Sequence, residues 1–588
     1  MNIEETSMKT KLLCLTLALA ASLSSSAAVA HGDKDDSLRR ETRFGPVVGV
    51  DDSAKSGTFA WKGVPFAKPP VGDLRWRPPV DPQPWKRPRL VREFGNACAQ
   101  NGRLFSPGAN NRYDETIATT LNTAVGSEDC LYLNIWQPAR HGKHLPVIVF
   151  VHGGSNISGY TADPVYDGAT LARTANAVVV TVNYRLGIFG FFNQPVLKTG
   201  DPIEDSGNFA MLDIKKALEF VRDNIRHFGG NPKNVTLMGQ SAGGVNVYAM
   251  LTSPLVVEAR QKLFHRLVPI SGGLSLASEL PPGSIATLAP ASAFLLQGNL
   301  FLQQQLIADG LATDAASAAA YVASHTTQEL AGYLRSRSTA ALLATVLTRL
   351  TPLGIGGSGP IPEGTVLPVD PVAEIQAGRY LRVPILAGNT RDEGKLFPTL
   401  LALSPALGGV SGRLVTDAQL FNIQFSYRPN DRPQIAITDW IPAVYLPVDT
   451  PVTGFNARTD LLNRIFFIAS RDSILNALRA QQDELWYYQF DWALEPYPFN
   501  EIYGAAHAFD LPFIFGTFGP SLFSNVVNST ANRPGRLALA RAMMRSLGAF
   551  ARHGDPNESA GLDVHWPVWP ATLHFDATPT SKVITVDD

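Results

Sequence analysis

The chain has 588 residues and a formal net charge of −1, and its lysines and arginines are scattered rather than clustered. Nucleic-acid-binding proteins usually carry a basic patch, so this pattern argues against that class of partner and favours a small molecule. Hydrophobic residues make up 45% of the chain, and no repeat, charge block or Ser/Gly-rich linker divides it. We therefore expect one large domain over residues 31–588, present as a monomer or a small homo-oligomer.

Residues 1–30 have the pattern of an export signal. Lys9 and Lys11 precede the apolar run Leu12–Leu23, and an Ala-Val-Ala tripeptide at 28–30 offers a cleavage site of small residues. Spanning a bilayer takes ~20 apolar residues, which neither this run nor any later one supplies. We expect translation to begin at the first methionine or at Met8, and the mature protein to be secreted or periplasmic without stable membrane insertion.

Removal of the signal takes Cys14 with it and leaves two cysteines, Cys98 and Cys130. In an oxidising compartment two remaining thiols usually pair, so we predict one structural disulfide between them. Such a bond contributes ~3–4 kcal/mol to stability through loop closure. Two separate buried thiols are the alternative, and a nucleophilic cysteine is disfavoured because neither thiol has a reactive-site sequence around it.

Short β-rich apolar runs recur along the chain and predict strands, several of them buried on both faces. These runs are 147–151, 178–182, 235–238, 383–387 and 485–490. Between the second and third runs, residues 209–228 place apolar side chains at helical spacing. Strand, helix and strand in that order predict an α/β fold with a doubly wound, mostly parallel sheet, whose active residues lie on loops at the carboxyl ends of the strands.

A five-residue pattern around Ser241 follows the third strand directly. Gly239-Gln240-Ser241-Ala242-Gly243 comes after the run 235–238, and residues 242–251 read as a helix closed by Pro254. A serine hydroxyl is a poor nucleophile unless a tight turn holds it exposed beside a base, and glycines two residues to either side allow such a turn. Chance matches are frequent, but the strand, turn and helix together predict a nucleophilic serine.

Residues 280–375 break the alternation of strands and helices and read as a helical insertion. Helical stretches are expected at Leu300–Leu311 and Ala315–Leu334. Because the insertion lies between the serine strand and the strand at 383–387, we expect it to cover the active site and shape the pocket, and packing elsewhere is the alternative.

Two carboxylates and one histidine complete the candidate site. Asp392 and Glu393 follow the strand at 383–387, and either one could orient an imidazole or be a solvated loop charge. Among the 11 histidines, His507 stands in a glycine-bounded loop shortly after the strand at 485–490, as a loop-borne base would. A lone histidine is more often structural, so position alone does not assign it.

The strand at 147–151 runs directly into His152-Gly153-Gly154-Ser155. Backbone N–H groups in such a loop bind the oxyanion of a tetrahedral intermediate without steric obstruction. We expect Gly154 and Ser155 to donate there, together with Ala242, the residue after the candidate nucleophile. An ordinary Gly-Gly turn is the alternative.

Four separated blocks of sequence share a wider pattern. They are Gly63-Val64-Pro65-Phe66-Ala67 to Trp76, Glu128-Asp129-Cys130-Leu131-Tyr132-Leu133-Asn134-Ile135, Asn183-Tyr184-Arg185-Leu186-Gly187, and Phe228-Gly229-Gly230-Asn231-Pro232 to Gly244. With these blocks the chain resembles the type-B carboxylesterases and cholinesterase-like α/β-hydrolases over essentially its whole mature length. The resemblance implies an α/β-hydrolase fold, a catalytic triad of Ser241, Glu393 and His507, a Cys98–Cys130 disulfide and a structural ion pair between Arg75 and Glu128.

The chain departs from that family at several positions. Gln240 stands where many members have glutamate, and the Cys98–Cys130 loop contains no tryptophan, so choline esters are poor candidates. Ser155 replaces the usual third glycine and Asn156 the following aromatic residue. We expect a narrower and more polar oxyanion loop, Ser155 as a further donor, and a bias against bulky alcohol groups. Changes at Ala210 and Ile214 are interpreted as packing.

Taken with the resemblance, the sequence predicts a bacterial, exported hydrolase of carboxylic esters that works through an acyl-enzyme. Its substrates are expected to be small to medium, uncharged or weakly acidic esters, and no metal or organic cofactor is implied. Five aromatic residues are candidates for the pocket wall, although such residues are more often core: Phe397, Phe421, Phe425, Tyr427 and Trp440. Hydrolysis of amides or carbamates by the same triad is one alternative, and a non-catalytic binding module is the other.

Overall fold

The computed structural model describes residues 37–140, 142–397, 416–428, 430–558 and 560–587. The predicted export signal, residues 1–30, lies outside the described residues. None of the helices in the described ranges combines the length and the apolar character needed to cross a membrane.

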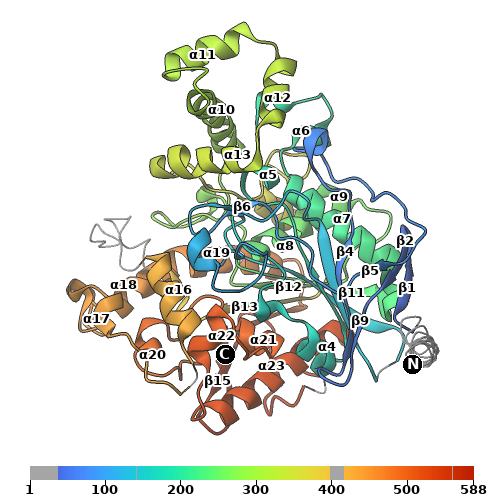
Figure 1. Cartoon of the computed structure of the whole chain (residues 1–588). Helices are drawn as coiled ribbons and strands as arrows, with labels where there is room; N and C mark the ends of the chain where they lie inside the picture. Colours follow the sequence, from blue (N-terminus) through green and yellow to red (C-terminus); the bar gives the residue numbers. More distant parts are fainter. Residues whose placement is uncertain (1–36, 141, 398–415, 429, 559, 588) are drawn as a thin grey trace, which may run out of the picture.

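An eleven-stranded sheet forms the centre of the molecule (Figure 1). In sheet order its strands are β16 (Lys582–Asp587), β15 (Thr572–Ala577), β14 (Leu485–Phe490), β13 (Ile385–Thr390), β12 (Arg266–Ile270), β11 (Gly230–Gln240), β9 (Leu145–Val151), β10 (Val178–Val182), β8 (Tyr132–Pro138), β4 (Thr58–Pro65) and β3 (Val50–Asp52). Neighbours from β15 to β10 pair in parallel, and the pairs at both edges are antiparallel. The predicted mostly parallel sheet is confirmed, and β12 and the edge strands extend it.

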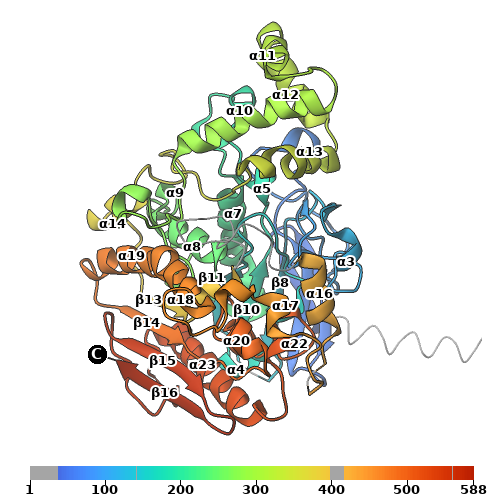
Figure 2. The same ribbon diagram turned by 90° about the vertical axis from the view of Figure 1, so that its left-hand side faces the viewer.

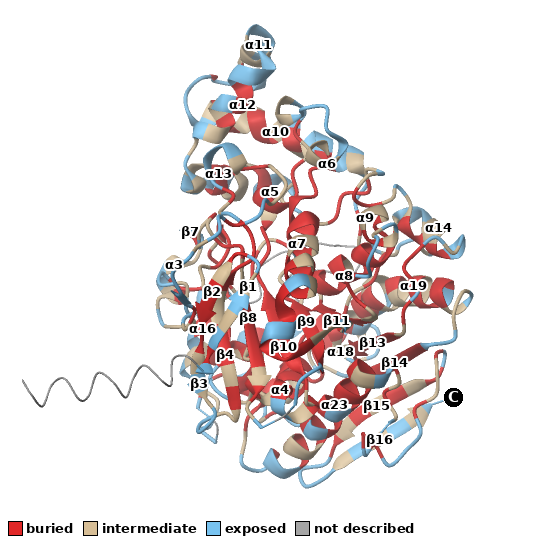
Figure 3. Ribbon diagram, turned by 90° about the vertical axis from the view of Figure 1, so that its right-hand side faces the viewer, coloured by how far each residue is buried: buried red, intermediate tan, exposed pale blue. Residues whose placement is uncertain are grey.

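The central strands are buried because helices cover both faces of the sheet (Figure 3). All seven residues of β9 are buried. Val147, Val149 and Val151 pack in one cluster with α7 (Phe209–Asn224), α8 (Ala242–Thr252) and α19 (Ala469–Arg479). The alternate residues Ile148 and Phe150 pack in a second cluster with α4 (Ala169–Ala175) and α23 (Arg533–His553). The period-2 geometry of a strand thus divides one apolar run between two cores.

The insertion forms helices that project from the sheet (Figures 1 and 2). They are α10 (Ala291–Ala308), α11 (Ala315–Ser324), α12 (Thr327–Ser336) and α13 (Thr339–Thr345). The stretch 315–334, expected as helical throughout, is broken between α11 and α12. A capping box starts the second helix there: the Glu329 N–H donates to Thr326 Oγ1 at 3.2 Å, and the Thr326 N–H donates to Glu329 Oε2 at 2.8 Å.

One disulfide and one buried ion pair cross-link the amino-terminal half of the chain. Cys98 and Cys130 form a disulfide, which confirms the predicted pairing. Arg75 donates from Nε to Glu128 Oε2 at 2.8 Å, and both side chains are buried. The guanidinium also donates to the Arg337 carbonyl oxygen at 2.7 Å, just beyond α12. This ion pair therefore joins the disulfide loop to the insertion.

Candidate active site

Ser241 lies in a tight turn between β11 and α8. Its φ is +58°, an uncommon conformation for a residue with a side chain. A Cβ on Gly239 would lie 2.2 Å from the Gly243 carbonyl oxygen, and a Cβ on Gly243 would lie 2.2 Å from the Val151 carbonyl oxygen. Glycine is therefore required at both positions, and the predicted strand, turn and helix around Ser241 are present.

His507 and Glu393 meet because β13 and β14 are parallel neighbours. The two strands pair as far as Thr390 and Phe490, and the chain after β14 then makes a loop and returns beside the end of β13, where Asp392 forms an isolated parallel bridge with Ala506. Glu393 follows Asp392 and His507 follows Ala506, and His507 Nδ1 is hydrogen bonded to Glu393 Oε2. Residues 114 positions apart in the chain are thus brought into contact where the loop after β14 returns beside the end of β13.

The Glu393 carboxylate is fully buried and held in place by three groups. Its Oε1 accepts hydrogen bonds from Asn389 Nδ2 and from the Thr390 N–H, each at 2.9 Å, while Oε2 faces His507. Burial by itself would raise the pKa of Glu393, but the interaction with His507 and the hydrogen bond from the Thr390 N–H hold the pKa below its usual value. Glu393 is consequently an anion that can orient the imidazole.

Asp392, the other carboxylate candidate, faces away from His507. Its Oδ2 accepts from the Ala505 N–H at 3.0 Å and from Arg391 Nη2 at 2.8 Å. The sequence left two candidates for the carboxylate beside His507, and the structure distinguishes them: Asp392 shapes the loop, and Glu393 contacts the imidazole.

The other side of the imidazole is enclosed by aromatic rings and an amide. The ring centroids of Phe397 and Phe467 lie 5.0 and 5.1 Å from that of His507. Gln240 Nε2 lies 3.1 Å from His507 Nε2. Within the described ranges, no hydrogen bond joins Ser241 Oγ to the imidazole.

The glycine loop after β9 presents unused donors. Gly154 and Ser155 have φ of +103° and +55°. In the part of the chain that the structure describes, the N–H groups of Gly154, Ser155 and Ala242 make no hydrogen bond, which leaves them available for an oxyanion. Asn156 is buried, and a hydrogen bond to α8 anchors the loop through it: Asn246 Nδ2 donates to Asn156 Oδ1 at 2.8 Å.

His152, at the start of this loop, is a structural histidine. Its ring is buried and stacks on Tyr184 with centroids 4.6 Å apart. Burial lowers the pKa of His152 to about 4. The imidazole is therefore neutral at physiological pH.

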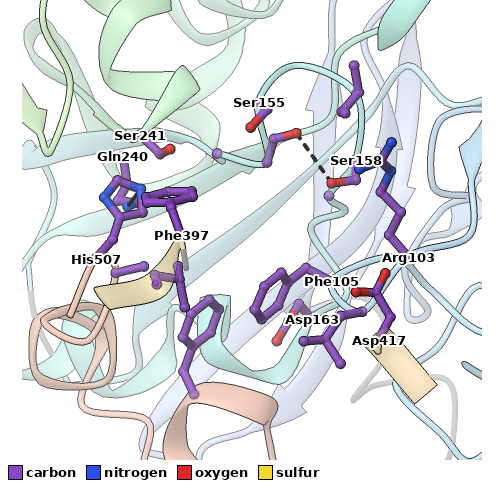
Figure 4. Close-up of a pocket in the computed structure, with 18 of the residues that line it drawn as sticks. Arg103, Phe105, Ser155, Ser158, Asp163, Gln240, Ser241, Phe397, Asp417 and His507 are labelled. Atoms are coloured by element: carbon purple, nitrogen blue, oxygen red, sulfur yellow. Dashed lines mark hydrogen bonds between the residues drawn. The ribbon is translucent and has the colours of Figure 1, made fainter. Parts of the chain in front are cut away.

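Two cavities open on either side of Ser241 (Figure 4 shows the first). The first measures about 290 Å³ and reaches from Ser241 and His507 to Arg103 and Asp417. The second measures about 230 Å³. Three residues line both: Ser155, Ser241 and Phe397.

The pocket walls differ in part from the sequence-based expectations. Of the five aromatic candidates, Phe397 and Trp440 line the first cavity. Phe421 and Tyr427 belong to buried clusters, and Phe425 packs against the cluster of Phe421. None of the described residues lining either cavity comes from α10–α13. The insertion contributes instead through its two ends, residues 285–287 and 358–360, which line the second cavity.

Comparison with known proteins identifies the family. The model of the Carboxylesterase family matches residues 36–582. The chain belongs to the carboxylesterase family. The fumonisin B1 esterase of Sphingopyxis macrogoltabida is 34% identical over 92% of this chain and 86% of its own length. The para-nitrobenzyl esterase of Bacillus subtilis (strain 168) is 29% identical over 90% and 92% of the two chains.

Solved structures agree with the family assignment. A Geobacillus stearothermophilus carboxylesterase superposes with a TM-score of 0.67 at 28% identity, covering 94% of this chain and 98% of its own. The carboxylesterase described here therefore has the α/β-hydrolase fold and hydrolyses carboxylic esters.

Sequence reasoning missed several residues around the histidine of this carboxylesterase. Asp510 is fully buried, and Tyr488 Oη donates to its Oδ2 at 2.9 Å. Burial raises the pKa of Asp510 to about 7. Phe467 and the side-chain contact of Gln240 were also unforeseen. Asp510 lies three residues after His507, and that proximity was the one available signal.

Proposed function

We propose that Ser241, His507 and Glu393 form the catalytic triad of this carboxylesterase. The observation that carries the proposal is the position of His507: its Nδ1 is bonded to a buried carboxylate, and the residue lines the same cavity as Ser241. This is the arrangement that a general base beside a nucleophile requires.

The geometry supports a two-step hydrolysis. Ser241 Oγ attacks the ester carbonyl carbon while His507 Nε2 takes the hydroxyl proton, and Glu393 stabilises the resulting imidazolium. The N–H groups of Gly154, Ser155 and Ala242 bind the oxyanion. His507 then gives its proton to the leaving alcohol. A water that gives a proton to the same nitrogen attacks the acyl carbon, and His507 returns that proton to Ser241 Oγ as the carboxylic acid leaves.

The substrate class is proposed to be small to medium, uncharged or weakly acidic esters. Two cavities of similar volume on either side of Ser241 support a substrate with two modest halves. Arg103 lines the first cavity, and its side chain forms no hydrogen bond or ion pair with any other described residue. The carboxyl groups of Asp163 and Asp417 share that wall, and burial raises the pKa of Asp163 to about 6.

An unpaired guanidinium can donate hydrogen bonds to a free carboxylate that an ester substrate carries beside its ester group. We expect Arg103→Gln to raise KM about tenfold for a half-ester of a dicarboxylic acid and to leave KM for the matched neutral ester within twofold. A preference of the wild type for cationic esters would contradict the proposed class.

Covalent labelling tests the triad. The purified protein should take up one fluorophosphonate group by intact mass, and Ser241→Ala should abolish both the adduct and the turnover of a p-nitrophenyl ester. Glu393→Gln should lower kcat by about 10⁴, as loss of the orienting acid does in triads. Its matched control is the adjacent Asp392→Asn, which should stay within tenfold. No adduct on folded wild-type protein would refute the proposal in favour of a binding module, and faster cleavage of a matched amide would favour an amidase.

We also propose that the protein is exported. Support comes from the pattern of residues 1–30 and from the Cys98–Cys130 disulfide, a bond typical of oxidising compartments. Expression with and without residues 1–30 in a bacterial host, followed by fractionation, tests this. Equal cytoplasmic retention of both forms would contradict it.

A further inference from the structure

The side chain of Gln240 contacts the nitrogen of His507 that must act as the base. Gln240 is buried, and its Nε2 lies 3.1 Å from His507 Nε2. Among the hydrogen bonds of the described residues, none links that nitrogen to Ser241. In this structure the amide of the preceding residue therefore takes the place expected for the serine hydroxyl.

The direction of this hydrogen bond follows from the opposite side of the imidazole. Glu393 is an anion with a depressed pKa, so it accepts, and His507 Nδ1 carries the proton between them. Neutral imidazole has one N–H only, so Nε2 presents a lone pair. The Gln240 amide must therefore donate its N–H to Nε2.

The glycine loop fixes where this amide can be. A Cβ on Gly153 would lie 2.7 Å from Gln240 Oε1 and 2.8 Å from the Gln240 carbonyl oxygen. The amide thus lies between the backbone of Gly153 and the imidazole, and it also lines the first cavity. Its position beside both the base and the substrate space is built into the fold.

We propose that Gln240 is a positioning residue that holds the neutral imidazole in the resting enzyme and reverses its hydrogen bond during acylation. The inference rests on the proposed triad. The amide N–H first leaves the lone pair of His507 Nε2, which frees this nitrogen as a base. When Ser241 then attacks, its O–H bond breaks, the proton moves to Nε2 and an Oγ–C bond forms. Nε2 is now a donor, so the amide turns its Oε1 toward the imidazole. Glutamine carries a donor and an acceptor on one planar group, whereas glutamate can only accept.

A pH profile separates this role from a purely structural one. The titratable groups among the described residues that face His507 are Glu393 from η8 (Glu393–Leu396) and Asp510 at the start of α21 (Leu511–Phe515). The Gln240→Glu variant keeps both of these residues, so the substitution adds one carboxylate to an otherwise unaltered set of titratable groups. A carboxylate at position 240 stabilises the imidazolium, so the acid limb of kcat/KM should move to higher pH by about one unit or more.

Gln240→Asn provides a second variant, because its amide is one methylene shorter and water can take the vacated space. The donor to neutral imidazole is lost, so the acid limb should again move to higher pH, by less than in Gln240→Glu. The same limb is measured in the rate of phosphonylation by a small fluorophosphonate, which does not depend on the choice of ester. Melting temperatures identify variants that have failed to fold.

The outcomes distinguish this inference from the proposed function. If wild-type protein is labelled at Ser241 and turns over esters, but folded Gln240→Glu and Gln240→Asn both keep the wild-type acid limb, the role of Gln240 is refuted and the triad stands. If wild-type protein is not labelled at Ser241, the triad itself fails. A larger shift for glutamate than for asparagine in both assays supports the reversal.

Discussion

Asn246 on the helix after Ser241 holds Asn156 in the glycine loop through a pair of amide hydrogen bonds, at 2.8 Å in one direction and 3.3 Å in the other. The segment that carries the candidate nucleophile is thereby joined to the segment that carries the candidate oxyanion donors. Both side chains are buried, so each amide depends on the other for satisfaction.

Asn246→Ala should loosen this connection. Leaving the buried Asn156 amide without its partner should cost about 1–3 kcal/mol of stability. A displaced loop should lower kcat about tenfold to a hundredfold with a smaller change in KM, because donor placement matters most in the transition state. Urea unfolding and steady-state kinetics measure both effects. Asn224→Ala, at a buried asparagine of α7 just before the amino end of β11, is the control: it should lose stability but keep kcat.

Ser155→Gly should stabilise the protein. Ser155 has φ of +55°, which costs a residue with a Cβ about 1–2 kcal/mol that glycine avoids. If the backbone N–H is the oxyanion donor, activity should remain within a few-fold of wild type. Ser155→Ala, which keeps the Cβ and removes the hydroxyl, should retain both wild-type stability and activity. A tenfold or greater loss of kcat in both variants would assign the donor role to the hydroxyl instead.

Asp510→Asn should change how stability depends on pH. The pKa of Asp510 is raised by burial from 3.8 in its ordinary state to about 7 in the folded protein. Between these values the unfolded chain releases the proton while the folded chain retains it, so the wild type loses stability as pH rises, by at most about 1.4 kcal/mol per unit. Relative to wild type, the variant should gain stability from pH 4 to 7 and level off above. Urea unfolding across this range would contradict the assignment if the difference stayed constant.

Removal of the disulfide should destabilise the protein without altering the triad. The bond closes a loop with a sequence separation of 32, for which chain entropy gives about 4 kcal/mol. The double variant Cys98→Ser, Cys130→Ser should therefore melt below the oxidised wild type and match the wild type treated with a reductant. Equal melting of the oxidised wild type and the variant would show that the cross-link adds nothing.

Strands and turns that depend only on neighbouring residues could be predicted from the sequence. β9 is fully apolar, β10 is apolar except for Thr181, and both could be read directly from the sequence. The turn at Ser241 needs only its own glycines. β12 was missed because its Arg-Leu-Val-Pro-Ile sequence contains a charge and a proline. The single stretch predicted over 315–334 failed because a capping box outweighs apolar spacing.

The pairing of Glu393 with His507 has a non-local cause. It depends on the loop after β14 returning beside the end of β13, which no spacing in the sequence reveals, and only the family resemblance selected Glu393 over Asp392. The Gln240 contact depends on one rotamer and on the space left by Gly153. Burial around Asp510 likewise arises only when distant segments pack.

Phe397 forms a wall of both cavities and also packs against the candidate base. Variation at this one position changes the room in both cavities at the same time, and under the proposed function these cavities receive the two halves of an ester. A lineage adapting to a bulkier group on one side of the scissile bond would therefore alter its tolerance on the other. The two specificities of this enzyme are expected to evolve together.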